Sequence, residues 1–203
     1  MAVITISRQF GAGGKTLGQM VAKELGYTFA DNDIIQRLAK EANVSTKWVI
    51  AQEKEAGNVF SRWINSMVPK TKIDWILKDD KGYIDEQIYL DYLVLIIAQV
   101  ADEGDVVILG RGSQYILRDH PEAYHVLLVN DLENRVKFMM ETYGLSESKA
   151  RSTVTGEDKR RLNLYRRLGK TDYDSSSLYH LVLNMGRMTL EDAKSQILHL
   201  IGK

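Results

Sequence analysis

Residues 3–16, VITISRQFGAGGKT, decide the fold of this chain. A short β-type run leads into a glycine-rich turn, and a Lys-Thr pair then opens an amphipathic helix with apolar side chains at Leu17, Met20, Val21 and Leu25. A strand, a turn of this kind and a helix in this order indicate a phosphate-binding loop. A phosphate chain needs several backbone N–H groups pointed at it, and residues without a Cβ let the backbone wrap that closely.

The loop is predicted to bind nucleotide phosphates through Gly11, Ala12, Gly13 and Gly14. Lys15 adds a fixed positive charge for the terminal phosphates, which makes it a candidate catalytic residue as well as a binding residue. Thr16 can offer its hydroxyl to Mg²⁺, and the following helix directs its positive end at the same place. ATP and Mg²⁺ are therefore the expected ligands.

One position departs from the full loop pattern. The pattern has a glycine six residues before the lysine, where this chain has Gln9. The alternative interpretation is a glycine-rich strand-to-helix turn that binds nothing. The coincidence of strand, glycines, Lys-Thr and helix at the first strand favours the phosphate site.

Composition limits the function classes. The chain has 203 residues and 44% hydrophobic content, which fits one core with an appended lobe. Lysine plus arginine (27) balance aspartate plus glutamate (27), so no overall field attracts nucleic acid or a membrane. Without cysteine there is no disulfide or cysteine-bound zinc, and the four histidines have no metal-ligand spacing. Any metal is expected to be oxygen-ligated and to arrive with the nucleotide.

The apolar runs are short. The N-terminal run ends before Arg8 and has no cationic leader, so it is predicted to be a core strand rather than a signal peptide. No run approaches the roughly 20 residues of a membrane span. A cytoplasmic location is the resulting expectation, and no oligomeric state is predicted.

Strands and helices alternate along the chain. Further buried strands are predicted over residues 27–30, 105–109, 125–129 and 180–183, and helices over 33–42, 85–101, 131–143 and 189–201. This order predicts an α/β protein with a five-stranded parallel sheet, covered by helices on both faces. The ligand is expected at the carboxyl ends of the strands.

Residues 44–84 form an insertion between the second and third strands. It contains all three tryptophans, Trp48, Trp63 and Trp75, and its pattern indicates short helices. The tryptophans are predicted to form the small core of an accessory lobe, because aromatic residues at helical spacing more often pack than stack on a ligand. A lobe at this place could close over a second substrate.

Arg111 is the second candidate site. It lies in Gly110-Arg111-Gly112 directly after a buried strand, where its guanidinium can bind a phosphate through two nitrogens. It is expected to bind the acceptor; the alternative is a structural ion pair with Asp31 or Asp33. These two carboxylates follow the second strand. Asp33 can cap the next helix, while Asp31 can order the water shell of a metal or accept a hydrogen bond from the acceptor.

The segment 151–170 is rich in arginine and is predicted to be a lid. Phosphoryl transfer spreads negative charge over the migrating group, and arginines on a closing segment, here Arg160 and Arg161, can stabilise that charge. Gly156 and Gly169 bracket these residues as expected hinges. The alternative is a solvated helix face.

Four stretches together resemble a known family: ISRQFGAGGKTLG, YTFADNDII, VVILGRGSQYIL, and EDKRRLNLYRR leading into LYHLVLNMGRMTLEDA. The chain is similar to the nucleoside monophosphate kinases of the P-loop superfamily, and most to the cytidylate-kinase-like group. The resemblance implies a P-loop NTPase-type three-layer fold over residues 1–203, with 44–84 as the acceptor lobe and 151–170 as the lid. It also places Arg187 on the substrate-binding arginine that follows the last strand.

Our main hypothesis is an ATP-dependent kinase of a nucleoside monophosphate, with CMP or dCMP as the first guess. A kinase of another small acceptor and a nucleotide-binding module without transfer are the alternatives. Gly112 stands where cytidylate kinases usually carry aspartate, which puts the acceptor or the metal arrangement in doubt.

Overall fold

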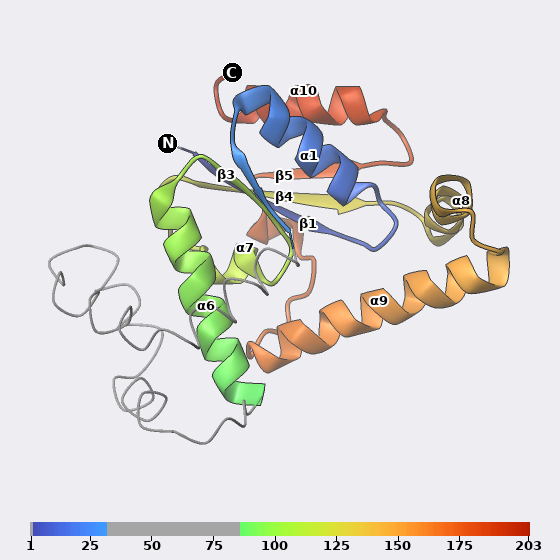
Figure 1. The fold of residues 1–203 in the computed structure, drawn as a ribbon, viewed down its shortest axis with the longest axis horizontal. Coiled ribbons are helices and arrows are strands. Elements are labelled where there is room, and N and C mark those ends of the chain that lie inside the picture. Colours follow the sequence, from blue (N-terminus) through green and yellow to red (C-terminus); the bar gives the residue numbers. More distant parts are fainter. Residues whose placement is uncertain (1, 32–85) are drawn as a thin grey trace, which may run out of the picture.

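The structure is a computed structural model that describes residues 2–31 and 86–203. Within these residues a five-stranded parallel sheet has the order β2-β3-β1-β4-β5 (Figure 1). The elements are β1 (Val3–Arg8), α1 (Gly14–Leu25), β2 (Thr28–Ala30), α6 (Glu86–Glu103), β3 (Val106–Leu109), α7 (Ser113–Ile116), β4 (Ala123–Val129), α8 (Leu132–Tyr143), α9 (Glu147–Arg167), the 3₁₀ turn η1 (Ser176–Leu178), β5 (Leu181–Asn184) and α10 (Leu190–Leu200).

Helices cover both faces of the sheet. On one face α1 and α10 lie side by side, and their apolar residues share a core with Ile4, Ile6 and Val126 of the strands. On the other face α6 and α7 pack against Val3, Val106 and Ile108. Strands buried on both sides are mostly apolar, as β3 is throughout and β1 is apart from the small residues Thr5 and Ser7 and its last residue, Arg8, and this is why they could be recognised in the sequence.

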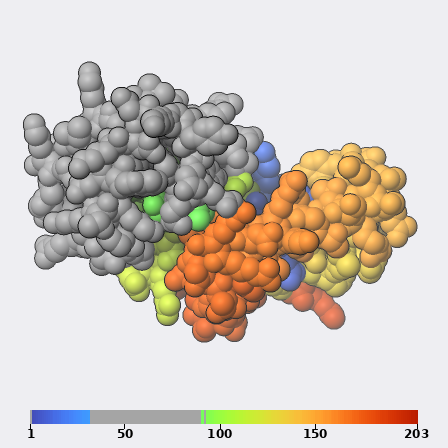
Figure 2. Space-filling view, turned by 90° about the horizontal axis from the view of Figure 1, so that it is seen from below, coloured from blue at the N-terminus to red at the C-terminus, as the bar shows by residue number. Residues whose placement is uncertain are grey.

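A separate small core joins α8 to α9. It contains Val136 and Met139 of α8 with Ala150 and Val154 of α9, and Phe10 of the phosphate loop packs against it. Figure 2, which looks onto the face that carries α9, shows this helix crossing the surface with the N-terminal segment in blue beside it. The loop and the predicted lid are therefore connected through shared apolar contacts.

The predicted α/β class with five parallel strands is confirmed. The helices expected over 85–101, 131–143 and 189–201 correspond to α6, α8 and α10. Residues 151–167 of the predicted lid belong to the unbroken helix α9, and Gly156, expected as a hinge, lies inside that helix. The expected helix 33–42, the lobe 44–84 and Asp33 lie outside the described residues.

In the described part of the chain, no helix combines the length and apolar composition that crossing a lipid bilayer requires.

Candidate phosphate-transfer site

The loop after β1 presents unpaired backbone amides at the start of α1. Gly13 is the N-cap of this helix with φ +80°, a backbone conformation that favours glycine. The first turn of a helix has N–H groups without an intrahelical partner, and here no side chain of the described residues caps the helix and its first turn has no acidic residue. The amides and the positive helix end are thus open to an anion.

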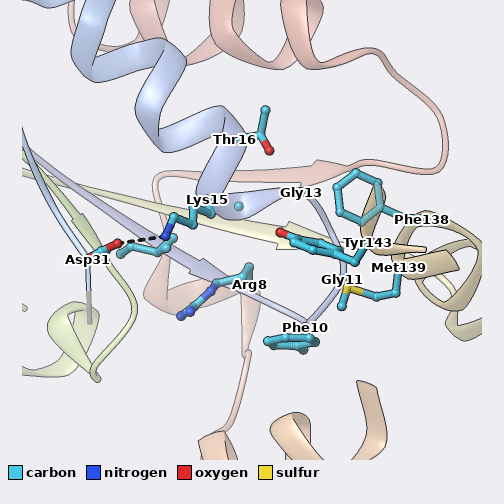
Figure 3. Close-up of a pocket in the computed structure, with 12 residues that line it drawn as sticks. Arg8, Phe10, Gly11, Gly13, Lys15, Thr16, Asp31, Phe138, Met139 and Tyr143 are labelled. Atoms are coloured by element: carbon cyan, nitrogen blue, oxygen red, sulfur yellow. Dashed lines mark ion pairs between the residues drawn. The ribbon is translucent and has the colours of Figure 1, made fainter. Parts of the chain in front are cut away.

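Lys15 and Asp31 face each other across the pocket at this loop. The Lys15 Nζ lies 3.2 Å from Asp31 Oδ2, and the Lys15 side chain is 53% exposed whereas Asp31 is mostly buried (Figure 3). The pocket has a volume of about 240 Å³. Residues of the loop, of α8 and of the carboxyl ends of β1, β2 and β3 line it: Arg8, Phe10, Gly11, Gly13, Gly14, Lys15, Thr16, Asp31, Leu109, Phe138, Met139 and Tyr143.

Aromatic side chains form the far wall of the pocket. Phe138 and Tyr143 of α8 meet edge to face, with ring centroids 6.5 Å apart, and Phe10 lies near them in the pocket lining (Figure 3). Sequence reasoning missed this wall. The helix was predicted, but nothing local indicates that its aromatic side chains would reach the phosphate loop.

Gln9 takes a structural role where the loop pattern has glycine. Its side-chain Oε1 accepts a 2.9 Å hydrogen bond from the backbone N–H of Asn130, the first residue after β4. Its own N–H donates to the Leu128 carbonyl at 3.0 Å. Gln9 therefore joins the start of the loop to the end of the neighbouring strand β4.

The next residue, Phe10, joins the loop to both α8 and α9. Its N–H donates to Asp158 Oδ1 at 2.9 Å, and its carbonyl accepts from Arg135 Nη1 at 3.1 Å. Arg135 and Asp158 also pair with each other at 2.6 Å. Sequence reasoning missed this buried network, because its members are distant in the chain.

Arg111 lies in the turn after β3, the strand that pairs with β1. Gly110, Arg111 and Gly112 have φ values of +72°, +63° and +72°, and a positive φ is unusual for arginine. Among the described residues Arg111 makes no ion pair, so the alternative pairing with Asp31 is not seen, and Asp33 lies outside them. Strained backbone of this kind concentrates at binding sites.

The sequence matches the model of a known protein family. A sequence model described as the cytidylate kinase-like family matches residues 3–187. The chain belongs to this family. Its membership confirms the resemblance seen in the sequence, and together with the fold it supports ATP-dependent phosphotransfer to a small substrate. No curated protein sequence matches the chain significantly.

Solved structures support the fold of this family member. An uncharacterized protein from Eubacterium ventriosum ATCC 27560 is similar with a TM-score of 0.71 and 20% identity, over 98% of this chain and 97% of that one. A shikimate kinase from Bacteroides thetaiotaomicron has a TM-score of 0.50 at 14% identity, covering 100% and 99%. A gluconokinase from Sinorhizobium meliloti 1021 has 0.50 at 12%, covering 98% and 91%. The protein thus has the P-loop NTPase-type fold.

The second departure of this kinase-like chain, Gly112, also has a local cause. A Cβ at this position would lie 2.5 Å from Cδ1 of Leu168, the residue that follows α9, and φ there is +72°. An aspartate at position 112 would therefore require strained backbone and a displaced Leu168. The side chain of Leu168 occupies this part of the rim.

The two predicted lid arginines have different surroundings. Arg160 is 78% exposed and pairs with Glu157, one helical turn earlier. Arg161 is largely buried and donates two hydrogen bonds, of 2.6 and 2.7 Å, to the carboxylate of Asp174. Its guanidinium also lies over the ring of Tyr165, 5.6 Å from the centroid. The structure brings Arg161 to the interior side of α9 and leaves Arg160 in solvent.

Arg187 lies at the same edge of the sheet as the phosphate loop. It follows β5, is exposed, and donates its backbone N–H to the Asn184 carbonyl at 2.9 Å. Within the described ranges 2–31 and 86–203, no group of three or more His, Cys, Asp or Glu residues could hold a metal ion. Thr16 and Asp31 are the oxygen donors of the pocket that fit a Mg²⁺ ion arriving with a nucleotide.

Proposed function

We propose that this protein transfers the γ-phosphoryl group of ATP to a nucleoside monophosphate, with CMP or dCMP as the first acceptors to test. One observation carries the proposal. The open amides at the start of α1, the Lys15–Asp31 pair and the Arg111 turn all lie at the carboxyl edge of one parallel sheet. A donor phosphate site and a cationic acceptor site are thereby adjacent, as phosphoryl transfer requires.

The loop and Lys15 would hold the donor. Residues 11–16 bind the phosphate chain through backbone amides, and Lys15 exchanges Asp31 for the terminal phosphate. Asp31, once released, can orient water or the acceptor. Thr16 and Asp31 would hold Mg²⁺, which supplies neutralisation of phosphate charge when it is bound. Lys15, fixed at the start of α1, stabilises the negative charge that develops during transfer.

The aromatic wall of Phe138 and Tyr143 is suited to the nucleoside part of ATP. An aromatic face stacks on a base, and these rings flank the same pocket as the loop glycines. Arg111, in the turn after the neighbouring strand β3, is suited to the acceptor phosphate. The hydrogen bond to Asp174 holds Arg161 on the interior side of α9, which supports a role in stabilising charge during transfer. Arg160 is exposed, so we expect at most a minor role for it. Arg187 is kept as a substrate-binding candidate.

The test is ADP release from Mg-ATP with a panel of acceptors. The panel contains CMP, dCMP, UMP, AMP and GMP, and hydroxy acids such as shikimate and gluconate. We expect release above the acceptor-free rate with a nucleoside monophosphate, and its loss in Lys15→Ala. ADP release with a hydroxy acid and with none of the nucleotides would contradict the proposal that the acceptor is a nucleoside monophosphate. ATP binding without any transfer would instead identify a binding module.

A further inference from the structure

Arg8, the last residue of β1, lies within the candidate site although the sequence did not single it out. Its side chain lines the pocket with Lys15 and Asp31 (Figure 3). The stem passes over Gly14, where a Cβ would lie 2.9 Å from Arg8 Cγ, and the guanidinium lies against Gly110. A Cβ at Gly110 would collide with Arg8 Nη1. Two glycines from different segments thus provide the space that Arg8 occupies.

The charge of Arg8 has no carboxylate partner among the residues that the structure describes. Burial, with smaller effects of the positive charges of Arg111 and Arg161, lowers the pKa of its guanidinium to about 10. Tyr165 and, to a smaller extent, Glu157 oppose this lowering, and the Glu157 carboxylate itself pairs with Arg160. Arg8 is partly buried and lines the pocket, and a partly buried cation beside two like charges is costly unless an anion joins it.

A buried hydroxyl lies beside the same arginines. Tyr165 is 1% exposed, and in the described part of the chain its hydroxyl has no hydrogen-bond partner. Its ring is under the Arg161 guanidinium, and its hydroxyl raises the pKa of Arg8 against the larger effect of burial. Guanidinium nitrogens and a hydroxyl are donors, and phosphate oxygens are acceptors that match them. The cluster is therefore complementary to a phosphate group.

We propose that Arg8 is a phosphate-binding residue, fixed on the central strand between the phosphate loop and the Arg111 turn. The phosphate oxygens it binds belong either to the γ-phosphate of ATP or to the acceptor, and both would approach from the same pocket. Unlike a lid arginine, Arg8 is in place before any movement, because the backbone of Gly14 and Gly110 holds its side chain. The inference rests on the proposed kinase function.

The experiment measures binding by calorimetry, with no need for turnover. Wild type, Arg8→Met and Arg8→Lys are titrated with Mg-ADP, with the non-hydrolysable ATP analogue AMP-PNP, and with CMP. Arg118→Met is the matched control, because Arg118 is exposed and lies outside the pocket. Melting temperatures are recorded for all four proteins without ligand.

We expect Arg8→Met to bind Mg-ADP within about twofold of wild type. A charge-assisted contact contributes about 1.5–3 kcal/mol, so one of the two other ligands should bind on the order of 10- to 100-fold more weakly. Weaker AMP-PNP binding assigns Arg8 to the γ-phosphate, and weaker CMP binding assigns it to the acceptor. Arg8→Lys should recover part of the loss, since it keeps the charge without the planar fork.

A purely structural arginine gives a different pattern. Arg8→Met would then melt well below wild type and bind both ligands normally, and this result would overturn the inference. We expect the opposite, a melting temperature equal to or above that of wild type, because the variant removes a partly buried charge that has no carboxylate partner among the described residues. Failure of wild type to bind any nucleotide would instead reject the proposed function itself, so the two failures are distinguishable.

Discussion

Gln9 shows how one residue of the loop can depart from the common pattern and still form the loop. Its amide oxygen accepts the Asn130 N–H, a bond that glycine could not form. The glycine spacing and the Lys-Thr pair are local signals, and they could be found in the sequence. The hydrogen bond of the Gln9 side chain could not be found in this way, because its partner Asn130 follows a strand far along the chain.

Gln9→Gly, which restores the common pattern, should lower the free energy of unfolding by about 1–2 kcal/mol. The substitution leaves the Asn130 N–H without its partner and adds a flexible residue to the unfolded chain. Urea unfolding measures the difference. Gln9→Glu keeps an acceptor at the same place and should lose less; equal stability of Gln9→Gly and wild type would contradict the role assigned to the side chain.

Arg8 and Arg111 differ in whether a local sequence signal reveals them. Arg111 could be predicted because two glycines flank it at the end of an apolar run. Arg8 has no such signature, since the space it needs is provided by Gly110 in the turn after another strand, β3. A contact of this kind becomes visible only when the strand order is known.

At the scale of elements, α9 is the main difference between expectation and structure. Only Ala150, Val154 and Tyr165 of its 21 residues are buried, so its apolar pattern is too weak to identify a long helix. Arg160 and Arg161 are adjacent in the sequence, but a helix turns consecutive residues to different directions. Sequence reasoning therefore treated as equivalent two arginines that the helix separates.

The two arginines of α9 should contribute unequally to turnover. Arg160→Ala should keep kcat within about twofold of wild type, because an exposed pair contributes little. Arg161→Lys should lower kcat at least about tenfold at nearly constant Kd for ATP, since lysine cannot reproduce the bidentate bond to Asp174. Steady-state kinetics and ATP titration measure both values. Equal effects of the two variants would refute the distinction.

Gly156 offers a test of how the lid is built. Its position inside α9 is exposed, and no atom of the described residues lies within 4 Å of a Cβ added there. Gly156→Ala should therefore raise the free energy of unfolding by about 1 kcal/mol and leave kcat unchanged. A large drop in kcat with the expected gain in stability would show instead that α9 bends at Gly156 during turnover.

At the scale of the whole molecule, the alternation of strands and helices was sufficient to predict the α/β sheet, because burial on both faces produces recognisable apolar runs. The buried polar contacts between strands were not predictable. His125 of β4 is an example: it is 3% exposed, and its Nδ1 lies 2.8 Å from Thr5 Oγ1 of β1. Its role depends on the pairing of these two strands.

His125 should make the stability of the fold depend on pH. Burial, with a smaller effect of His180, lowers the pKa of His125 to about 4, whereas an unfolded histidine has a pKa of about 6.5. Between these values the unfolded state binds a proton that the folded state does not, so stability falls as pH falls.

Between pH 7 and pH 4.5, protonation of His125 in the unfolded state should lower the free energy of unfolding by about 2–3 kcal/mol. Urea unfolding of wild type and His125→Asn at both pH values measures it. The variant should show a smaller loss over this range, by about that amount, although its stability at pH 7 is itself lower. Parallel losses in the two proteins would contradict a buried neutral His125.

The central claim is that the loop of residues 9–16 delivers the γ-phosphoryl group of ATP to an acceptor phosphate. ³¹P NMR of a reaction with Mg-ATP and CMP tests it most directly, in wild type and in Lys15→Ala. In wild type we expect new diphosphate signals from CDP and ADP. In Lys15→Ala both should appear at least about a hundredfold more slowly. Equal rates of CDP formation in the two proteins would contradict it.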